Sequence, residues 1–157
     1  MKAILGIGTN IGERENNITL AVESLSRLPS TSVEKVSAMY ETKPWGYAEQ
    51  DNFVNVCVML ETNLSPNALL GACLGIESAM GRLRPFKNSP RIIDIDVLLY
   101  EDIRMNTDEL KIPHPFIKER SFVLVPMHDI IYNNKFFSYD ISDAYEKCDK
   151  SEIIKKI

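Results

Sequence analysis

The order in which two hydrophobic repeats alternate along this chain limits its fold more than any other feature of the sequence. Short apolar runs or two-residue alternations predict strands, and apolar residues at three- and four-residue steps predict helices. Pro29 ends the first predicted helix, while Ser65-Pro66 begins the second and Gly81 ends it. Strands are predicted at residues 3–9, 32–42, 53–60 and 92–100, and helices at residues 18–28 and 66–80.

The order strand-helix-strand-strand-helix-strand predicts an α+β fold, a ferredoxin-like β-α-β-β-α-β sandwich with an antiparallel sheet. We expect both helices on one face of the sheet and the other face free for ligands. Beyond Glu101 the chain reads as a C-terminal extension, with a turn at residues 112–115, a short helix at residues 122–130 and a polar tail. We predict a single domain over residues 1–157.

Composition and charge exclude several classes of protein. Apolar residues make up 45% and charged residues 25%, which is typical of a globular domain. A formal net charge of -4 argues against general attraction to nucleic acid or anionic membrane, which both need excess Lys and Arg. The apolar run at residues 3–5 is too short for a signal peptide. Three cysteines without zinc-like spacing read as reduced packing residues, so we expect a cytoplasmic protein.

The first predicted strand ends in a glycine-rich segment. Gly6, Gly8 and Gly12 have the spacing GxGxxxG, which does not match a dinucleotide-binding loop. We attribute these glycines to a tight turn that needs positive φ.

Two acidic residues on the last predicted strand are the first candidates for chemistry. Asp94 and Asp96 are two residues apart, so their side chains leave the same face with Cα atoms about 6.5 Å apart. Adjacent carboxylates repel each other, and divalent cations between them relieve that repulsion. Two Mg²⁺ ions held there would match a polyphosphate. A solvated face that carries two acids explains the pattern equally well.

A basic loop precedes this acidic pair. Arg82, Arg84, Lys87 and Arg91 fall within ten residues, and arginine matches the geometry of phosphate oxygens. We therefore predict a bound anion bridged by metal, with mobile arginines that close over a triphosphate. Stabilisation of a helix C-terminus is the competing explanation for Arg82 and Arg84.

Other side chains are weaker candidates. His114 and Arg120 are placed to reach the same phosphates, although a histidine without a role is the more common case. Asn55 interrupts an apolar strand, and an amide both donates to and accepts from the edge of a heterocycle. Phe53, Trp45 and Phe122 are aromatic candidates to hold a flat ring, with ordinary core packing as the alternative.

In combination these segments resemble the 6-hydroxymethyl-7,8-dihydropterin pyrophosphokinase family, from Ala3 to about Pro126. The resemblance includes the opening Gly8-Thr9-Asn10-Ile11-Gly12 and the aromatic-x-Asn of Phe53-Val54-Asn55. The remaining motifs are Tyr40-Glu41-Thr42-Lys43-Pro44, Glu77, Gly81-Arg82-Leu83-Arg84, Pro90-Arg91-Ile92-Ile93-Asp94-Ile95-Asp96, Pro113-His114-Pro115 and Glu119-Arg120-Ser121-Phe122-Val123-Leu124.

The resemblance implies a cytoplasmic, monomeric enzyme that transfers diphosphate from ATP to the hydroxymethyl group of the pterin and releases AMP. Two Mg²⁺ bound with ATP would be held by Asp94 and Asp96, and the catalytic residues would be Arg82, Arg91 and Asp96. The implied ATP-binding residues are Glu77, Arg82, Arg84, Arg91, His114 and Arg120. The implied pterin-binding residues are Thr42, Pro44, Trp45, Phe53, Asn55 and Phe122.

The chain departs from the family pattern in the catalytic loop. The family usually has Trp-Gly before the Pro-Arg of this loop, whereas this chain has Asn88-Ser89, so an aromatic lid over the pterin is missing. We hypothesise that Trp45 partly compensates, in which case Trp45→Ala raises the KM for the pterin.

Two other functions fit parts of the pattern. An RNA-recognition module has the same element order, but residues 53–60 lack its aromatic RNP pattern and the chain is acidic. A regulatory domain that binds ATP without chemistry would differ by releasing no AMP.

Overall fold

A computed structural model of the protein describes residues 1–83 and 85–157. Its main sheet has six strands in the order β10-β3-β4-β1-β5, with β2 also paired to β4. All of the pairings in this sheet are antiparallel. The sheet contains β1 (Lys2–Thr9), β2 (Thr31–Val36), β3 (Tyr40–Thr42), β4 (Phe53–Thr62), β5 (Asp94–Tyr100) and β10 (Ile153–Lys156).

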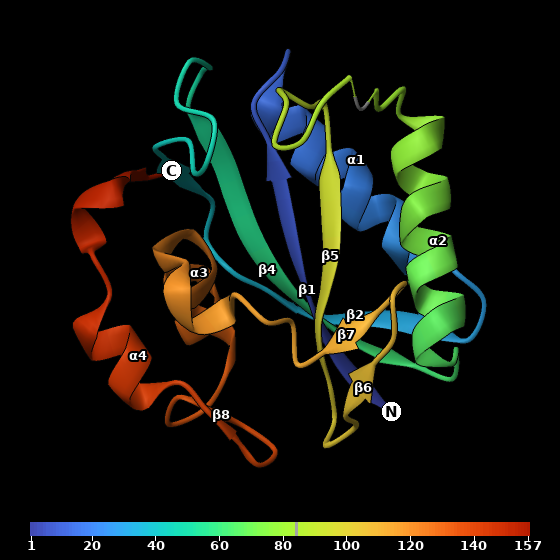
Figure 1. Ribbon diagram of the computed structural model, residues 1–157. Helices are drawn as coiled ribbons and strands as arrows, with labels where there is room; N and C mark the ends of the chain where they lie inside the picture. The colour runs from blue at the N-terminus through green and yellow to red at the C-terminus, as the bar shows by residue number, and fades with distance from the viewer. Residues whose placement is uncertain (84) are drawn as a thin grey trace.

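Helices cover both faces of the sheet, as Figure 1 shows. The α+β class and the antiparallel sheet predicted from the sequence are confirmed. On one face lie α1 (Arg14–Ser26) and α2 (Pro66–Ala79). On the other lies α3 (Ser121–Ile130), with α4 (Ser142–Lys147) outside it. The expectation that this second face is free was therefore wrong for the part that α3 covers.

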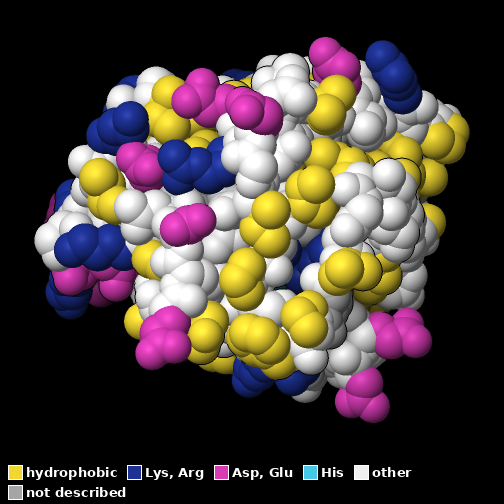
Figure 2. Space-filling view, turned by 90° about the horizontal axis from the view of Figure 1, so that it is seen from above, with side chains coloured by type: hydrophobic (Ala, Val, Ile, Leu, Met, Phe, Trp, Pro, Cys, Tyr) yellow, Lys and Arg dark blue, Asp and Glu magenta, His cyan; other side chains and the backbone are white. Residues whose placement is uncertain are grey.

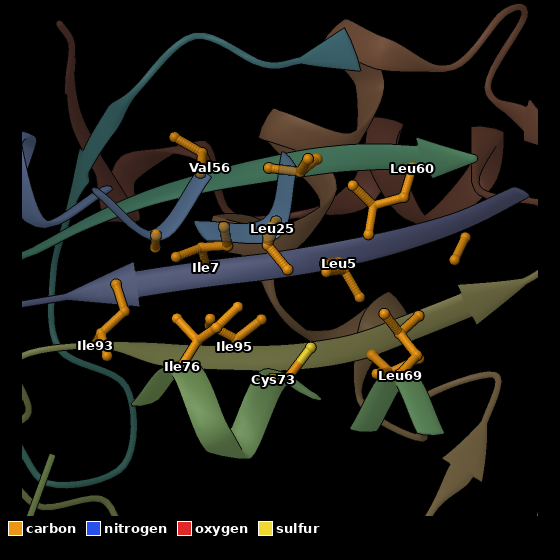
Figure 3. Close-up of a cluster of buried hydrophobic side chains, with 14 of the residues drawn as sticks. Leu5, Ile7, Leu25, Val56, Leu60, Leu69, Cys73, Ile76, Ile93 and Ile95 are labelled. Carbon is orange, nitrogen blue, oxygen red and sulfur yellow. The ribbon is translucent and has the colours of Figure 1, made fainter. Parts of the chain in front are cut away.

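The two-residue period of the central strands produces a separate apolar core on each face. Leu5, Ile7 and Val56 point toward α1 and α2, where they meet Leu25 and Cys73 (Figure 3). Ile4, Cys57, Met59 and Leu98 point the other way and pack with α3 residues such as Leu124 and Met127. Burial of both faces positions the sheet between two layers of helices.

One predicted strand, residues 32–42, is broken into β2 and β3. Ser37 lies at the break, where its N–H donates to Cys57 O and its Oγ accepts from Cys57 N, both at 2.9 Å. A side chain here replaces a backbone partner of the ladder, and the chain bends away before pairing with β4 again. The predicted helix at 18–28 begins and ends earlier, because α1 spans Arg14–Ser26.

The C-terminal extension is more ordered than a polar tail. The predicted helix at 122–130 is confirmed by α3, and the chain after it returns to the sheet as β10, on the outer edge of β3. The short elements are β6 (Met105–Asn106), β7 (Lys111–Ile112), the 3-10 helix η1 (Ile117–Glu119), β8 (Lys135–Phe136), β9 (Tyr139–Asp140) and the 3-10 helix η2 (Lys150–Glu152).

The structure also shows the state of the cysteines and the character of the helices. Cys57 and Cys73 are buried in the two cores and all three cysteines are free, which confirms the packing interpretation. None of the helices in residues 1–83 and 85–157 has the length and apolar character needed to cross a membrane.

Candidate active site

A cleft of about 1020 Å³ opens on the part of the second sheet face that α3 leaves uncovered. Figure 2 views the molecule from above and shows hydrophobic side chains around a recess in which Lys or Arg atoms are visible. Twelve of the site residues predicted from the sequence line this cleft, so the fold brings them together. They are Thr42, Trp45, Phe53, Asn55, Glu77, Arg82, Arg91, Asp94, Asp96, His114, Arg120 and Phe122.

The floor of the cleft is the central strand β1, where two glycines leave room for neighbouring side chains. Gly8 pairs with Asn55 on one side and Asp94 on the other, and a Cβ on Gly8 would lie 2.6 Å from Asn55 Oδ1. A Cβ on Gly6 would lie 3.2 Å from Leu98 Cδ1. The attribution of these glycines to a positive-φ turn was therefore wrong for Gly6 and Gly8, and it holds for Gly12, whose φ is 72°. Close approach of side chains explains the first two.

The two carboxylates lie on the same face of β5, as the two-residue period predicted. Asp94 and Asp96 alternate with the buried Ile95 and Val97, and their side chains are 21% and 41% exposed. Desolvation in the cleft and the nearby charge of Asp94 raise the pKa of Asp96 to about 7, although Arg120 and Arg91 act in the opposite direction. A carboxylate whose ionisation is disfavoured beside a second carboxylate marks a site that favours cations.

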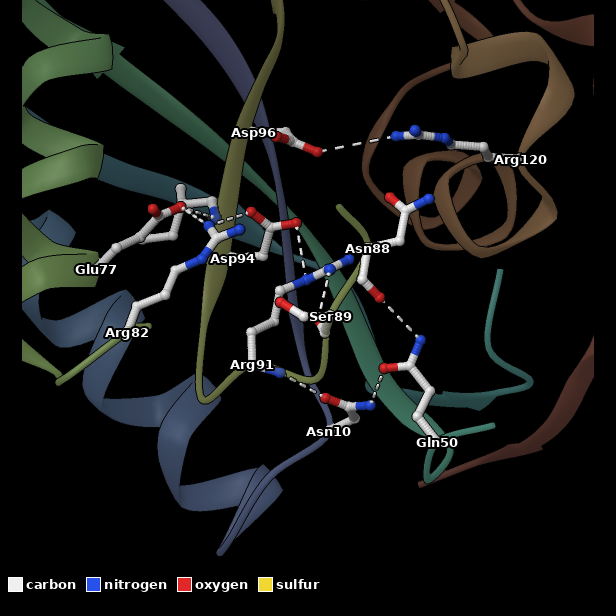
Figure 4. Close-up of polar contacts among 11 residues, drawn as sticks. Asn10, Gln50, Glu77, Arg82, Asn88, Ser89, Arg91, Asp94, Asp96 and Arg120 are labelled. Carbon is white, nitrogen blue, oxygen red and sulfur yellow. Dashed lines mark hydrogen bonds and ion pairs between the residues drawn. The ribbon is translucent and has the colours of Figure 1, made fainter. Parts of the chain in front are cut away.

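Arginine side chains supply those cations in this structure (Figure 4). Arg82 Nη1 lies 2.5 Å from Asp94 Oδ1 and 2.8 Å from Glu77 Oε1, and Arg91 Nε lies 3.2 Å from Asp94 Oδ2. Arg120 Nη1 approaches Asp96 Oδ2 from α3 at 3.9 Å. Basic groups from three segments thus converge on one acidic pair.

These arginines also carry unused donors. The Nε atoms of Arg82, Arg91 and Arg120 are buried and find no hydrogen-bond acceptor within the part of the chain that the structure describes. The contact of Arg91 Nε with Asp94 is an ion pair without the geometry of a hydrogen bond. Buried donors without acceptors are rare in folded proteins. An anion with several oxygen atoms, such as a polyphosphate, has the chemistry to satisfy them.

The donor set at Asp94 and Asp96 suits Mg²⁺. Over residues 1–83 and 85–157, no group of three or more His, Cys, Asp or Glu side chains is arranged to hold a metal ion. Mg²⁺ is commonly bound by one or two carboxylates and completes its octahedron with water and substrate phosphates. Two hard carboxylates beside phosphate-binding arginines fit that pattern.

His114 faces the same cleft in a fixed tautomer. Its Nδ1 accepts a hydrogen bond from the N–H of Phe116 at 3.2 Å, so the neutral ring carries its proton on Nε2. Burial and the positive charge of Arg120 lower the pKa of His114 to about 4, with Asp94 acting the other way. His114 is therefore a neutral hydrogen-bond donor at physiological pH.

Aromatic rings form another wall of the cleft and lie close to the guanidinium groups. The Arg120 Cζ lies 4.5 Å from the ring centroid of Trp45, 5.1 Å from that of Phe116 and 5.6 Å from that of Phe122. Arg91 Cζ lies 5.0 Å from the Phe53 centroid. Guanidinium groups this close over the ring faces indicate surfaces suited to a flat heterocycle.

A buried amide lies beside these rings. Asn55 is 7% exposed and its Nδ2 donates to Thr42 Oγ1 at 2.7 Å. This bond fixes which end of the amide is the acceptor and places Asn55 Oδ1 over Gly8. The wall therefore offers an oriented amide next to two aromatic surfaces.

The loop between β3 and β4 and the loop between α2 and β5 both border the cleft. Sequence reasoning missed the residues that hold these two loops together. Asn10, 3% exposed, donates through Nδ2 to Gln50 Oε1 at 2.8 Å and accepts through Oδ1 from Arg91 N at 2.9 Å. Gln50 Nε2 in turn donates to Asn88 O at 3.2 Å. Figure 4 shows this chain of bonds joining the end of β1 to both loops. A polar residue directly after a buried strand was the available signal.

Arg84 lies outside the described residues. Pro44 is half-buried between two lining residues but does not line the cleft itself. Glu77 on α2 lines the cleft but is only 3% exposed, and its Oε1 accepts from Ile95 N at 2.7 Å.

Comparison with known proteins decides the family. The profile of the 7,8-dihydro-6-hydroxymethylpterin-pyrophosphokinase (HPPK) family matches residues 4–132. The chain belongs to this family. A 2-amino-4-hydroxy-6-hydroxymethyldihydropteridine pyrophosphokinase of Methylorubrum extorquens is 43% identical over 97% of this chain and 96% of its own length. The enzyme of the same name from Bacillus subtilis is 41% identical over 82% and 77%.

Solved structures support the same fold. A chain from a Plasmodium falciparum HPPK-DHPS structure with pteroate aligns with a TM-score of 0.71 over 93% of this chain, at 18% identity. An HPPK-DHPS structure in complex with substrates aligns with a TM-score of 0.67 over 92%. This chain spans only 42% of the length of each of those chains.

In this HPPK family member, the loop that carries Asn88-Ser89, and so lacks the family's aromatic lid, contacts the facing loop directly. Asn88 has a φ of 57°, and its Nδ2 would lie 2.5 Å from a Cβ on Gly46 of the facing loop. Phe86 contacts Tyr47 edge-on, with centroids 5.2 Å apart. These contacts join the two loops directly, while Trp45 lies deeper, against Arg120.

Proposed function

We propose that this chain transfers the diphosphate of ATP to the hydroxymethyl oxygen of 6-hydroxymethyl-7,8-dihydropterin and releases AMP, a step of folate biosynthesis. Membership of the HPPK family supports the reaction. The observation that carries the proposal is the cleft in which Asp94 and Asp96 face three converging arginines, with aromatic rings and an oriented amide beside them.

The residues divide into an acidic and basic side for ATP and an aromatic side for the pterin. Asp94 and Asp96 are the proposed Mg²⁺ ligands, and Arg82, Arg91 and Asp96 form the catalytic group. The ATP side comprises Glu77, Arg82, Arg84, Arg91, His114 and Arg120. The pterin side comprises Thr42, Pro44, Trp45, Phe53, Asn55 and Phe122.

Catalysis in this arrangement comes from alignment and charge balance. When bound, two Mg²⁺ ions would withdraw charge from the phosphates. The arginines donate to phosphate oxygens as negative charge builds up on the AMP leaving oxygen, and the neutral His114 adds an Nε2 donor. Thr42 orients Asn55 so that the amide holds the pterin with its hydroxymethyl group toward the β-phosphorus.

The overall organisation follows from the same proposal. We infer that residues 1–157 form one pyrophosphokinase domain, and pairing of β10 with β3 supports this. The order of β1, α1, β2, β4, α2 and β5 supports a ferredoxin-like topology. We also propose that the enzyme is monomeric and cytoplasmic. Its cysteines are free, and two of the three are buried, which agrees with a reducing compartment.

The decisive experiment is to mix the protein with Mg²⁺, ATP and 6-hydroxymethyl-7,8-dihydropterin and to follow adenine nucleotides by chromatography. AMP should form in equal amount to the pterin diphosphate, and it should not form when the pterin is omitted or EDTA is added. ADP as the product would contradict diphosphate transfer. ATP binding without any AMP would indicate the regulatory domain considered above.

Gly8→Ala should raise the KM for the pterin about tenfold while the KM for ATP changes less than about twofold. The added Cβ would lie 2.6 Å from Asn55 Oδ1 and displace the amide. The matched control is Gly75→Ala on α2, where a Cβ meets nothing within 4 Å. That control should leave both KM values unchanged and stabilise the fold by about 0.5–1 kcal/mol. Equal kinetics for the two variants would contradict the role of Gly8.

Trp45→Ala should raise the KM for the pterin about fivefold, because the ring lines the cleft and its centroid lies 4.5 Å from Arg120 Cζ. Trp45→Phe keeps an aromatic surface and should restore most of the affinity. Trp45 is the single tryptophan, so its fluorescence reports ligand binding in the unmodified protein. An unchanged KM in Trp45→Ala would remove the hypothesis that this ring compensates for the missing lid.

A further inference from the structure

The last strand of the sheet lies directly behind the aromatic side of the cleft. Ile153 of β10 pairs with Thr42, and the N–H of Lys43 donates to Glu152 O at 2.9 Å. Without β10, β3 would be an edge strand with unpaired backbone groups. The strand therefore secures Thr42, the residue whose hydroxyl orients Asn55.

The side chain of Glu152 makes a second connection, to a different wall. Its Oε2 accepts a hydrogen bond from Ser121 Oγ. Ser121 is the first residue of α3 and is 2% exposed, and it lies between Arg120 and Phe122, which both line the cleft. Hydrogen bonds to a carboxylate are among the stronger ones, so this contact fixes the start of α3 against η2.

The pairing of β10 with β3 and the hydrogen bond from Ser121 to Glu152 hold segments that come together at Trp45. The Thr42 segment continues to Trp45, whose ring is centred 6.4 Å from that of Phe122 and 4.5 Å from Arg120 Cζ. Glu152 thus holds, from outside the cleft, the two segments whose side chains face each other inside it. The family profile ends at residue 132, so Glu152 lies beyond the matched segment.

We propose that Glu152 is a positioning residue for the pterin: it sets the separation of the Thr42–Trp45 wall from the Arg120–Phe122 wall. This inference rests on the proposed function. A slot for a flat ring is sensitive to small changes in width, since a displacement of about 1 Å far from the chemistry can reduce turnover about a hundredfold. The ATP-side residues on β5 and α2 do not touch this contact. Arg120, the ATP-side residue beside Ser121, keeps its ion pair with Asp96 and its contacts with the rings of Trp45 and Phe116 when the contact is lost, so ATP binding should change little.

The test compares Glu152→Ala and Ser121→Ala with the unmodified protein. We would measure AMP release, and also the Kd of 6-hydroxymethylpterin in the presence of a nonhydrolysable ATP analogue. Both variants should weaken pterin binding about five- to twentyfold, while the KM for ATP stays within about twofold. The double variant should be no weaker than either single variant, because both remove the same bond. Glu152→Gln, which keeps an acceptor oxygen, should return the Kd to within about threefold of the original value.

A matched control is Glu146→Ala, an exposed acid on α4. It should change neither constant. If pterin affinity is unchanged in Glu152→Ala and Ser121→Ala, or if ATP and pterin affinities fall together, the positioning role is overturned while the reaction stands. Should Glu152→Ala fail to fold, Ser121→Ala still tests the positioning role, because it removes the same contact from the other side. An unmodified protein that releases no AMP overturns the proposed function itself, and the positioning role with it.

Discussion

Asp96→Asn should reduce turnover at least about a hundredfold and at the same time make the protein more stable at pH 8. The amide keeps the shape of the side chain but is a poor Mg²⁺ ligand, so charge on the phosphates is no longer balanced. The stability gain arises because Asp96 is ionised beside Asp94 in a partly desolvated position. A residue whose removal stabilises the fold and abolishes activity is retained for function.

The pH dependence of this stability gain has a defined sign. The pKa of Asp96 is about 7 in the folded protein and about 3.9 in an unfolded chain, so ionisation of this group destabilises the folded state. Stability of the unmodified protein should therefore fall, relative to Asp96→Asn, as pH rises from about 4 to 7, and the gap should stay constant above pH 7. The side chain is 41% exposed, and solvent screening reduces the gap to about 1 kcal/mol, or about 2–4 °C in Tm.

Thermal unfolding in EDTA, from pH 4 to pH 8, measures this gap. Asp143→Asn is the matched control, because Asp143 is exposed on α4 and forms an ion pair only with Lys147 among the described residues. Asp143→Asn should leave turnover unchanged, and its difference in stability from the unmodified protein should not grow between pH 4 and pH 8. Robust turnover in Asp96→Asn would contradict the metal assignment, and lower stability at pH 8 would contradict the repulsion between the carboxylates.

Local periodicity was sufficient to predict β5 and α3, because it depends only on neighbouring residues. The alternation of Asp94, Ile95, Asp96 and Val97 placed both carboxylates on one face before any tertiary contact was known. The apolar pattern at 122–130 likewise predicted α3. It did not predict where α3 packs, since a helix with an apolar face does not specify which side of the sheet receives it.

Contacts between distant residues could not be predicted in this way. Asn10 contacts Gln50, which is 40 residues away, and Arg91, which is 81 residues away. Glu152 contacts Ser121, which is 31 residues away. No periodicity links such positions, and a lone Asn or Glu has many ordinary explanations. The same limit applied to Gly8, for which a turn and a close side-chain contact give the same residue preference.

Arg82→Ala should destabilise the fold by about 3 kcal/mol in addition to reducing turnover. The sequence suggested a mobile loop arginine, but the Arg82 side chain is 9% exposed and lies between Glu77, 4% exposed, and Asp94. Its loss removes the cation that separates two carboxylates, one of them buried, and breaking a buried charge pair typically costs about 3–5 kcal/mol. A mobile surface arginine would change stability by less than about 0.5 kcal/mol.

Urea unfolding of three variants distinguishes these cases. Arg27→Ala, an exposed arginine at the end of α1, is the matched control and should change the free energy of unfolding by less than about 0.5 kcal/mol. Adding Glu77→Gln to Arg82→Ala should recover part of the loss, because one of the two repelling charges is then neutral, while turnover stays low. If Arg82→Ala is as stable as Arg27→Ala, Arg82 does not link α2 to β5, and its contribution is confined to bound phosphate.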